Sequence, residues 1–270
     1  MKFIKMHGLG NDFVIFDCLT ASHKLTPDQV RSIANRREGI GCDQVGIINP
    51  SQNADCFMPI YNADGGEVGA CGNITRCVAL YLMNKLNKDA VDIETIEGVL
   101  ECSKASNGDI KVNMGIPKIS WEQIPLSKEM DTLNIDFQAG EFKNPVCVNV
   151  GNPHCIFIVD DLENIDLEKN GNYVEHHNLF PERTNVEFIK ILDRNTIRMK
   201  VWERGTGVTK ACGTGACASF IAAHRRGLVD NSAKVILDGG ELDISVDKNT
   251  GDIYMTGSAT FVFEGKITLP

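Results

Sequence analysis

Two short stretches of the chain repeat one chemical pattern. ACGNITRC covers residues 70–77 and ACGTGAC covers residues 211–217, so Cys71 and Cys212 each precede a glycine, a small polar residue and a predicted helix. Backbone N–H groups at a helix start lack partners within the helix, attract anions and favour a thiolate. Two such helix starts could hold a carboxylate and place one sulfur on each side of its α-carbon. A thiolate base and a thiol acid could then invert a stereocentre by removing a proton from one face and returning one to the other.

The competing interpretation is that both cysteines are buried residues at helix starts. Their companions Cys77 and Cys217 lie a turn or more inside the helices and are assigned to packing. The chain has 10 cysteines, without a C-x2-C pair or a histidine at finger spacing, so we predict no structural metal. Five further cysteines stand among apolar or strand-like neighbours and are predicted to be buried small hydrophobes: Cys18, Cys56, Cys102, Cys147 and Cys155.

A constant offset indicates an internal duplication. Cys212 follows Cys71 by 141 positions, and the same offset relates three other polar sites. It pairs Gly10-Asn11 with Gly151-Asn152, Gln44 with Asn185, and Asn62 with Glu203. We therefore expect two domains of similar fold, residues 1–117 and residues 118–261, with the tail 262–270 pairing back onto the first. The polar segment 118–141, which carries Pro125, is interpreted as a crossover or an added edge element.

The elements that must position these residues are short strands and a few helices. Runs such as Val45–Ile48, Val91–Thr95, Val186–Ile189 and Lys234–Leu237 alternate with turn residues and predict strands. Thr26-Pro27 predicts a helix start, and Gly213–Arg226 predicts a helix that Gly227 ends. This second helix is apolar around most of its circumference, which indicates enclosure. We expect an α+β fold with two pseudo-symmetric domains, each a mixed sheet or barrel wrapped around a central helix.

Polar residues at strand ends supply the remainder of a candidate pocket. An isolated loop amide is usually a turn residue, but a set in repeat register favours a pocket wall. The set is Asn11, Gln44, Asn62, Asn152 and Asn185. Arg204 could bind a distal carboxylate through two hydrogen bonds, and Glu203 could receive a distal ammonium. His154 has two open interpretations, a structural brace or a group that tunes a thiol or orients the substrate.

Composition limits the classes of partner. The chain has 270 residues, 43% of them hydrophobic, and a formal net charge of -9, which argues against nucleic acid or an anionic membrane as the main partner. The sequence begins without the apolar run of a signal peptide and has no segment of about 20 apolar residues. We therefore expect a cytoplasmic protein with reduced thiols. The paired motifs and the polar pocket residues, and not the composition, indicate a small-molecule substrate.

Six motifs together resemble the diaminopimelate epimerase family over residues 2 to about 268. They are KMHGLGNDF, YNADGGEV, ACGNITRC, GNPHC, FPERTNVEF and WERGTGVTKACGTGAC. The resemblance implies a two-domain fold with the active site in the cleft between the domains. It also implies interconversion of LL- and meso-2,6-diaminopimelate without cofactor or metal, in lysine and peptidoglycan biosynthesis.

The resemblance also implies roles for individual residues. Cys71 would be the proton donor and Cys212 the acceptor in the LL-to-meso direction, with His154 and Glu203 as auxiliary catalytic residues. The reacting α-carboxylate would be held by Gly72, Asn73, Gly213 and Thr214. The remainder of the substrate would be bound by Asn11, Gln44, Asn62, Asn152, Asn185, Glu203 and Arg204.

This chain departs from the family pattern at two places. Ile74 follows CGN where the family usually has a small residue. Phe263 stands where the family often has a tyrosine associated with dimerisation, so a homodimer is an expectation that this departure leaves open. Two other functions stay open: a racemase of another amino acid on the same scaffold, and a thiol-redox or zinc-binding module.

Overall fold

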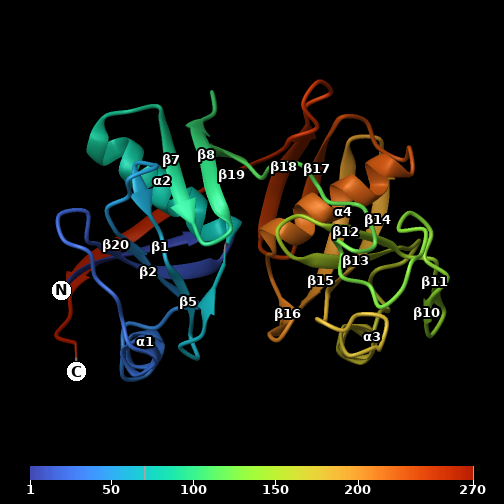
Figure 1. Cartoon of the computed structure of the whole chain (residues 1–270), viewed down its shortest axis with the longest axis horizontal. Helices are drawn as coiled ribbons and strands as arrows, with labels where there is room; N and C mark the ends of the chain where they lie inside the picture. Colours follow the sequence, from blue (N-terminus) through green and yellow to red (C-terminus); the bar gives the residue numbers. More distant parts are fainter. Residues whose placement is uncertain (70, 270) are drawn as a thin grey trace. The chain divides into compact units, whose positions relative to one another are not determined.

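The computed structural model describes residues 1–69 and 71–269, which form two compact units (Figure 1). The first unit contains Met1–Asn113 together with the described residues from Thr256 onward, and the second contains Met114–Met255. Strands dominate both units and helices are few. The chain is thus an α+β protein with two separate cores.

The first unit holds one main sheet in the order β20-β1-β2-β3-β5-β6. Its strands are β20 (Thr260–Lys266), β1 (Lys2–Gly8), β2 (Asn11–Asp17), β3 (Gln44–Ile48), β5 (Ile60–Asn62) and β6 (Glu67–Val68). Strands β7 (Ala90–Thr95), β8 (Gly98–Lys104) and β9 (Ile110–Asn113) form an antiparallel set, with β4 (Cys56–Phe57) parallel to β7. The C-terminal strand β20 runs antiparallel to β1, so the end of the chain completes this unit.

The second unit repeats this arrangement with an added hairpin. Its sheet follows the order β12-β13-β14-β15-β17-β18-β19, and β16 pairs with β15. The strands are β12 (Val146–Asn149), β13 (Pro153–Ile158), β14 (Asn185–Asp193), β15 (Thr196–Glu203), β16 (Gly207–Thr209), β17 (Ser232–Leu237), β18 (Gly240–Val246) and β19 (Ile253–Gly257). The hairpin consists of β10 (Gln138–Ala139) and β11 (Phe142–Lys143).

The strand register shows that the sequence duplication is also a structural one. In the first unit β2 and β3 are parallel and pair Phe13 with Gln44. In the second unit β13 and β14 are parallel and pair His154 with Asn185, each residue 141 positions later. The next, antiparallel neighbour keeps the same offset, because Val45 pairs with Tyr61 and Val186 pairs with Trp202. The predicted pseudo-symmetric fold class is confirmed by this correspondence.

Each unit packs its sheet strands against one buried helix. Helix α2 (Gly72–Leu86) contacts β1, β2, β7, β8 and β9, and α4 (Gly213–Arg225) contacts β12, β13, β14, β15, β17 and β18 (Figure 1). Helix α4 ends as predicted, because Arg226 is its C-cap and Gly227 adopts a φ of 69°. The peripheral helices are α1 (Pro27–Ala34), which Thr26 caps as predicted, and α3 (Leu167–Glu175).

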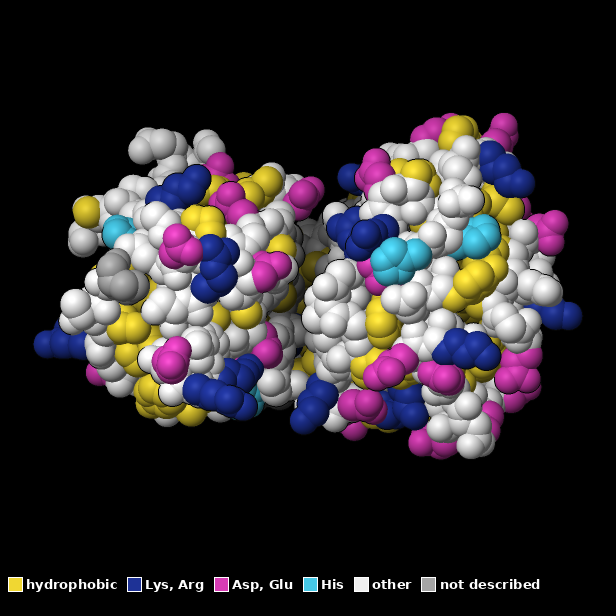
Figure 2. Space-filling model, turned by 90° about the horizontal axis from the view of Figure 1, so that it is seen from below, with side chains coloured by type: hydrophobic (Ala, Val, Ile, Leu, Met, Phe, Trp, Pro, Cys, Tyr) yellow, Lys and Arg dark blue, Asp and Glu magenta, His cyan; other side chains and the backbone are white. Residues whose placement is uncertain are grey.

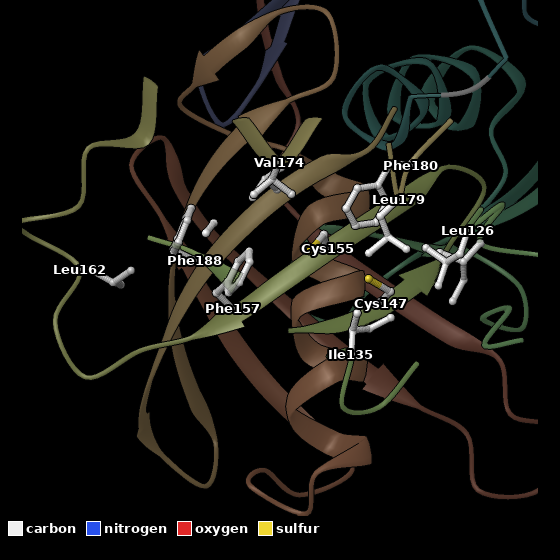
Figure 3. Packing of buried hydrophobic residues seen from close by; sticks show 13 residues of the cluster. Leu126, Ile135, Cys147, Cys155, Phe157, Leu162, Val174, Leu179, Phe180 and Phe188 are labelled. Carbon is white, nitrogen blue, oxygen red and sulfur yellow. The ribbon is translucent and has the colours of Figure 1, made fainter. Parts of the chain in front are cut away.

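The core of the second unit extends beyond the sheet. Phe157 on β13 stacks on Phe188 on β14 with ring centroids 5.2 Å apart (Figure 3). Ile124, Leu126 and Ile135 are buried in the same cluster. The segment 118–141 is therefore a cover over this core, with apolar anchors among its polar residues, and more than a polar crossover.

The distribution of charged residues and cysteines agrees with what the composition predicts. Acidic and basic side chains are interspersed over the faces drawn in Figure 2. In the described part of the chain, no helix is both long and apolar enough to cross a membrane. All ten cysteines are free thiols, and the five assigned to apolar surroundings are confirmed as buried.

Candidate active site

The first unit gathers its predicted polar residues at the start of α2. Cys71 is the N-cap and is half-buried, while Gly72 and Asn73 form the first turn and are buried. The Asn73 side-chain amide donates to Asn11 Oδ1 at 3.2 Å, which ties the helix start to the start of β2. Asn11 in turn donates to Asp43 Oδ2 at 2.8 Å, next to Gln44. Asn11, from the start of β2, and Asn73 therefore lie together at the N-terminus of α2.

Gln44 and Asn62 form a second pair in the same unit. The antiparallel register of β3 and β5 places them opposite each other, and Gln44 Nε2 donates to Asn62 Oδ1 at 2.9 Å. Both side chains are half-buried. An amide pair at paired strand ends presents donors and acceptors without a net charge, which suits recognition of a zwitterionic ligand.

A buried arginine that the motif analysis did not single out braces this helix start. Arg76 is fully buried, and its Nη2 donates to Asn73 Oδ1 at 3.0 Å while Nε donates to the Ser258 carbonyl at 3.3 Å. The Asn73 amide is therefore fixed from both sides. The signal in the sequence was a charged residue in the first half of a mostly apolar helix, where burial is permitted only with such partners.

In the second unit, strand ends again converge on a helix start. Asn152 precedes β13, Asn185 begins β14 and Glu203 ends β15. Asn185 is buried, donates to the Pro153 carbonyl at 2.9 Å and accepts from the Arg204 N–H at 3.0 Å. It therefore fixes the backbone beside two other predicted site residues. The Arg204 side chain is exposed and donates to the Glu182 carbonyl at 3.1 Å.

Cys212 is the N-cap of α4 and is 5% exposed. Its Sγ accepts from the Gly215 N–H at 3.3 Å and lies 3.5 Å from Thr214 Oγ1. Burial nevertheless raises the pKa of the thiol well above its usual range, and the charges of Glu203 and Glu187 add to this. The expectation that the helix start would favour a thiolate is therefore wrong for Cys212 in the free protein, because burial and two carboxylates outweigh two hydrogen bonds.

Glu203 connects this thiol to the end of β15. Its carboxyl accepts from Thr209 Oγ1 and is hydrogen-bonded to Cys212. Burial raises the pKa of Glu203, while these two hydrogen bonds lower it in part. A carboxyl with a raised pKa beside a thiol can accept a proton near neutrality.

His154 lies between two oxygens. Its Nδ1 is 2.7 Å from Glu187 Oε1 and its Nε2 is 2.8 Å from Asn152 Oδ1. Both His154 and Glu187 are completely buried. Glu187 was missed by the motif analysis, because the 141-position offset relates it to Gly46, which carries no functional group.

The predicted residues thus fall into hydrogen-bonded groups within each unit. At the start of α2 lie Asn11, Cys71 and Asn73, and Gln44 and Asn62 form a separate pair on β3 and β5. Around α4 lie Asn152, His154, Asn185, Glu203, Cys212 and Thr214. Within the described ranges, no group of three or more His, Cys, Asp or Glu residues is placed to hold a metal ion. The chemistry that these clusters offer is acid–base chemistry by thiols and carboxyls.

Comparison with known proteins identifies the family. The family model described as diaminopimelate epimerase matches residues 3–120 and 146–262. The chain belongs to the diaminopimelate epimerase family. A diaminopimelate epimerase from Rhodospirillum centenum is 45% identical over 269 residues, covering 99% of this chain and 92% of the relative. One from Caulobacter vibrioides is 47% identical over 278 residues, covering 98% and 96%.

Solved structures show the same fold at low sequence identity. A phenazine biosynthesis protein of the PhzF family from Bacillus anthracis aligns with a TM-score of 0.72 at 19% identity, covering 100% of this chain and 99% of that one. A hydroxyproline epimerase from Agrobacterium vitis aligns with a TM-score of 0.66 at 15% identity, covering 98% and 91%. The two-unit fold of the diaminopimelate epimerase family is therefore shared with these proteins.

Proposed function

We propose that this protein is a cofactor-independent isomerase that interconverts LL- and meso-2,6-diaminopimelate by a two-cysteine acid–base mechanism. The observation that carries the proposal is the repeated Cys-Gly helix start, with Cys71 capping α2 and Cys212 capping α4. Membership of the diaminopimelate epimerase family supports the substrate. The corresponding cellular role is lysine and peptidoglycan biosynthesis in the cytoplasm.

The raised pKa of Cys212 assigns an order to the steps. In the free protein Cys212 holds its proton, because its site is buried and faces two carboxyls. A cationic group of the bound substrate near the sulfur would offset that negative charge and lower the pKa of the thiol. The proton of Cys212 then passes to Glu203, to which it is hydrogen-bonded. The resulting thiolate removes the α-proton of the LL substrate.

Cys71 completes the inversion from the opposite face. Its thiol donates a proton to the α-carbon, so one proton leaves the substrate and one enters. The N–H groups of Gly72, Asn73, Gly213 and Thr214 bind the α-carboxylate, whose negative charge grows as the α-proton leaves. His154 assists on the Cys212 side. In the reverse direction the two cysteines exchange roles.

The remaining residues select a substrate with a second amino-acid end. Asn11, Gln44, Asn62, Asn152 and Asn185 contribute amide donors and acceptors, and Arg204 binds the distal carboxylate. The Arg204 guanidinium is available for such a pair, because it is exposed and its Nη1 donates to the Glu182 backbone carbonyl rather than to a carboxylate. Glu203 receives an ammonium.

We further propose that the protein is a homodimer through strand β20. This strand lies at the edge of its sheet and exposes Phe261, Val262 and Phe263 by 54%, 49% and 45%. Phe263 also packs edge-on against Phe3, with ring centroids 6.0 Å apart. A molar mass in solution from light scattering tests this, and a monomeric mass at micromolar concentration would contradict it.

Incubation with LL-diaminopimelate in deuterated water tests the main proposal. Loss of the α-proton NMR signal, together with formation of the meso isomer, is expected for the wild-type protein. Cys71→Ala and Cys212→Ala should each abolish epimerisation while leaving the fold intact. Cys77→Ala is the matched control, because this buried cysteine lies more than one turn further along α2 and acts only through packing. Substantial turnover by either active-site variant would contradict the two-cysteine mechanism.

A further inference from the structure

Glu187 is a fully buried carboxyl on β14, an interior strand of the second unit. Its Oε1 contacts His154 Nδ1 at 2.7 Å. Its Oε2 is also buried and has no hydrogen-bond partner among the described residues. A buried carboxyl with one oxygen unsatisfied is costly to the fold, so its presence calls for a reason other than stability.

Glu187 and Cys212 converge on Gly215. The Cβ of an alanine at position 215 would lie 2.8 Å from Glu187 Oε1 and 3.2 Å from Cys212 Sγ. The glycine has an ordinary helical backbone, so what it provides is space rather than conformational freedom. The Glu187 carboxyl and the Cys212 sulfur thus both lie next to the space that a side chain at position 215 would occupy.

In the first unit an apolar side chain occupies the corresponding space between strand and helix. The residues 141 positions earlier are Gly46 and Ile74. A Cβ at Gly46 would lie 2.6 Å from Ile74 Cδ1, so the large residue is on the helix and the glycine on the strand. The second unit reverses this, with Glu187 on the strand and Gly215 on the helix. Since one copy packs this space without charge, the fold does not require a carboxyl in the other.

The protons of the His154 contacts can be counted. Both ring nitrogens face oxygens, Glu187 Oε1 at one end and Asn152 Oδ1 at the other. If each contact contains one proton, the Glu187–His154 pair is neutral in total, whether the shared proton is on the ring or on the carboxyl. The other titratable groups near the Glu187–His154 pair are Glu203 from β15 and Cys212 from α4. The shared proton can therefore move between the ring and the carboxyl without a change in the total charge of the pair.

We propose that Glu187 is a positioning residue that orients His154 by sharing a proton with it and thereby adjusts the charge around Cys212. This inference rests on the proposed epimerase function. Glu187 does not touch the reacting atoms and acts through His154 and through the space over Gly215. The Ile74–Gly46 packing is the uncharged form of the same contact, so the two cysteines work in different electrostatic surroundings.

Glu187→Gln tests the proposal without a large change in shape. The amide keeps a hydrogen bond to His154 but removes the carboxylate and the shared proton. We expect kcat to fall about tenfold to a hundredfold, as for other carboxylates that orient a histidine, with KM changed less than about threefold. The pH profile of Cys212 alkylation, followed by peptide mass spectrometry, should move to lower pH, because a carboxyl that raises the pKa of the thiol is gone. An unchanged kcat, or a fall in kcat without a shift in the alkylation profile, would overturn the proposal.

A double variant replaces the carboxyl by the uncharged packing of the first unit. Glu187→Gly combined with Gly215→Ile copies the glycine and isoleucine of the first unit into the second. We expect a midpoint of thermal unfolding near that of the wild type but a kcat as low as that of Glu187→Gln; wild-type kcat would overturn the proposal. Failure of the wild-type protein to exchange the α-proton would refute the epimerase function instead. The alkylation profile would still report on the link between Glu187 and Cys212.

Discussion

Gly215→Ala is the smallest change that disturbs the Glu187 contact, and its effects can be weighed against one another. Alanine in place of a helical glycine favours folding by about 1 kcal/mol. The new methyl would lie 2.8 Å from Glu187 Oε1, and this fully buried carboxyl is held by His154 and cannot swing into solvent. Losing the hydrogen bond of a buried polar group costs about 1–3 kcal/mol. The net loss of unfolding free energy is therefore about 0–2 kcal/mol.

We expect Gly215→Ala to change the unfolding midpoint little and kcat strongly. For a chain of this size each kcal/mol lowers the unfolding midpoint by about 2–4 °C, so the midpoint should fall by no more than about 8 °C. By contrast, kcat should fall more than tenfold, because the methyl displaces both the carboxyl and the Cys212 sulfur from their positions. Thermal unfolding by circular dichroism and the deuterium-exchange assay measure the two quantities on one preparation.

The matched control is Ile74→Ala, the corresponding position of the first unit. Removing most of a fully buried isoleucine leaves a cavity and costs about 2–5 kcal/mol, with no carboxyl involved. This variant should lose more stability and less activity than Gly215→Ala. In a Glu187→Gly background Gly215→Ala should cost less, because the contact with the carboxyl is gone and only the 3.2 Å contacts with Cys212 remain. A Gly215→Ala protein with wild-type kcat and a raised midpoint would refute the reasoning, since the carboxyl would then have moved freely.

Three further results are expected. Arg204→Lys should lower kcat/KM for diaminopimelate by about 2–5 kcal/mol in equivalent free energy, because an ammonium cannot make two coplanar hydrogen bonds to a carboxylate; comparable racemisation of lysine by the wild type would contradict this role. Alkylation of Cys212 should keep accelerating above pH 9, because its pKa is raised, and Glu203→Gln should shift that profile to lower pH by removing a carboxylate. Asp12, whose pKa is lowered from 3.8 to about 2 by hydrogen bonds to Arg36 and Lys5 that outweigh its burial, should stabilise the fold above about pH 4 and lose that effect as pH falls toward 2. Asp12→Asn should thus cost about 1–2 kcal/mol in urea unfolding at pH 7, after allowance for solvent around Arg36, and almost nothing at pH 2.

The duplication is what made so much of the fold accessible from the sequence. Hydrogen-bond register preserves residue spacing, so a constant offset between Gln44 and Asn185 implied equivalent places on equivalent strands, as the pairing of β2–β3 and β13–β14 confirms. The helix starts were equally clear, because Cys-Gly before a long apolar run leaves few other conformations. The hydrogen bond from the Asn73 amide to Asn11 Oδ1 was not part of this prediction, and only the fold shows it.

The proton affinity of Cys212 could not be predicted in this way. The field of a helix start is a local property and can be read from the residues around Gly213. Burial and the two carboxyls come from β14 and β15, which only the tertiary fold brings to the sulfur. Glu187 escaped for a related reason: within NVEFI it occupies an ordinary alternating strand position, and only its contact with His154 shows that it is buried and paired.

The two copies of the motif have kept their geometry and differ in the residues that pack beside the helix start. A symmetric pair of thiols would have the same proton affinity and would offer no distinction between acid and base before the substrate binds. Here one copy packs Ile74 over Gly46, while the other sets Glu187 and Glu203 around Cys212. Duplication therefore supplies two equivalent helix starts, and divergence at a glycine and its facing residue supplies different surroundings for the two thiols. Because Glu187 and Gly215 compensate for each other in volume, this divergence requires both positions to change, and either change alone leaves a clash or a void.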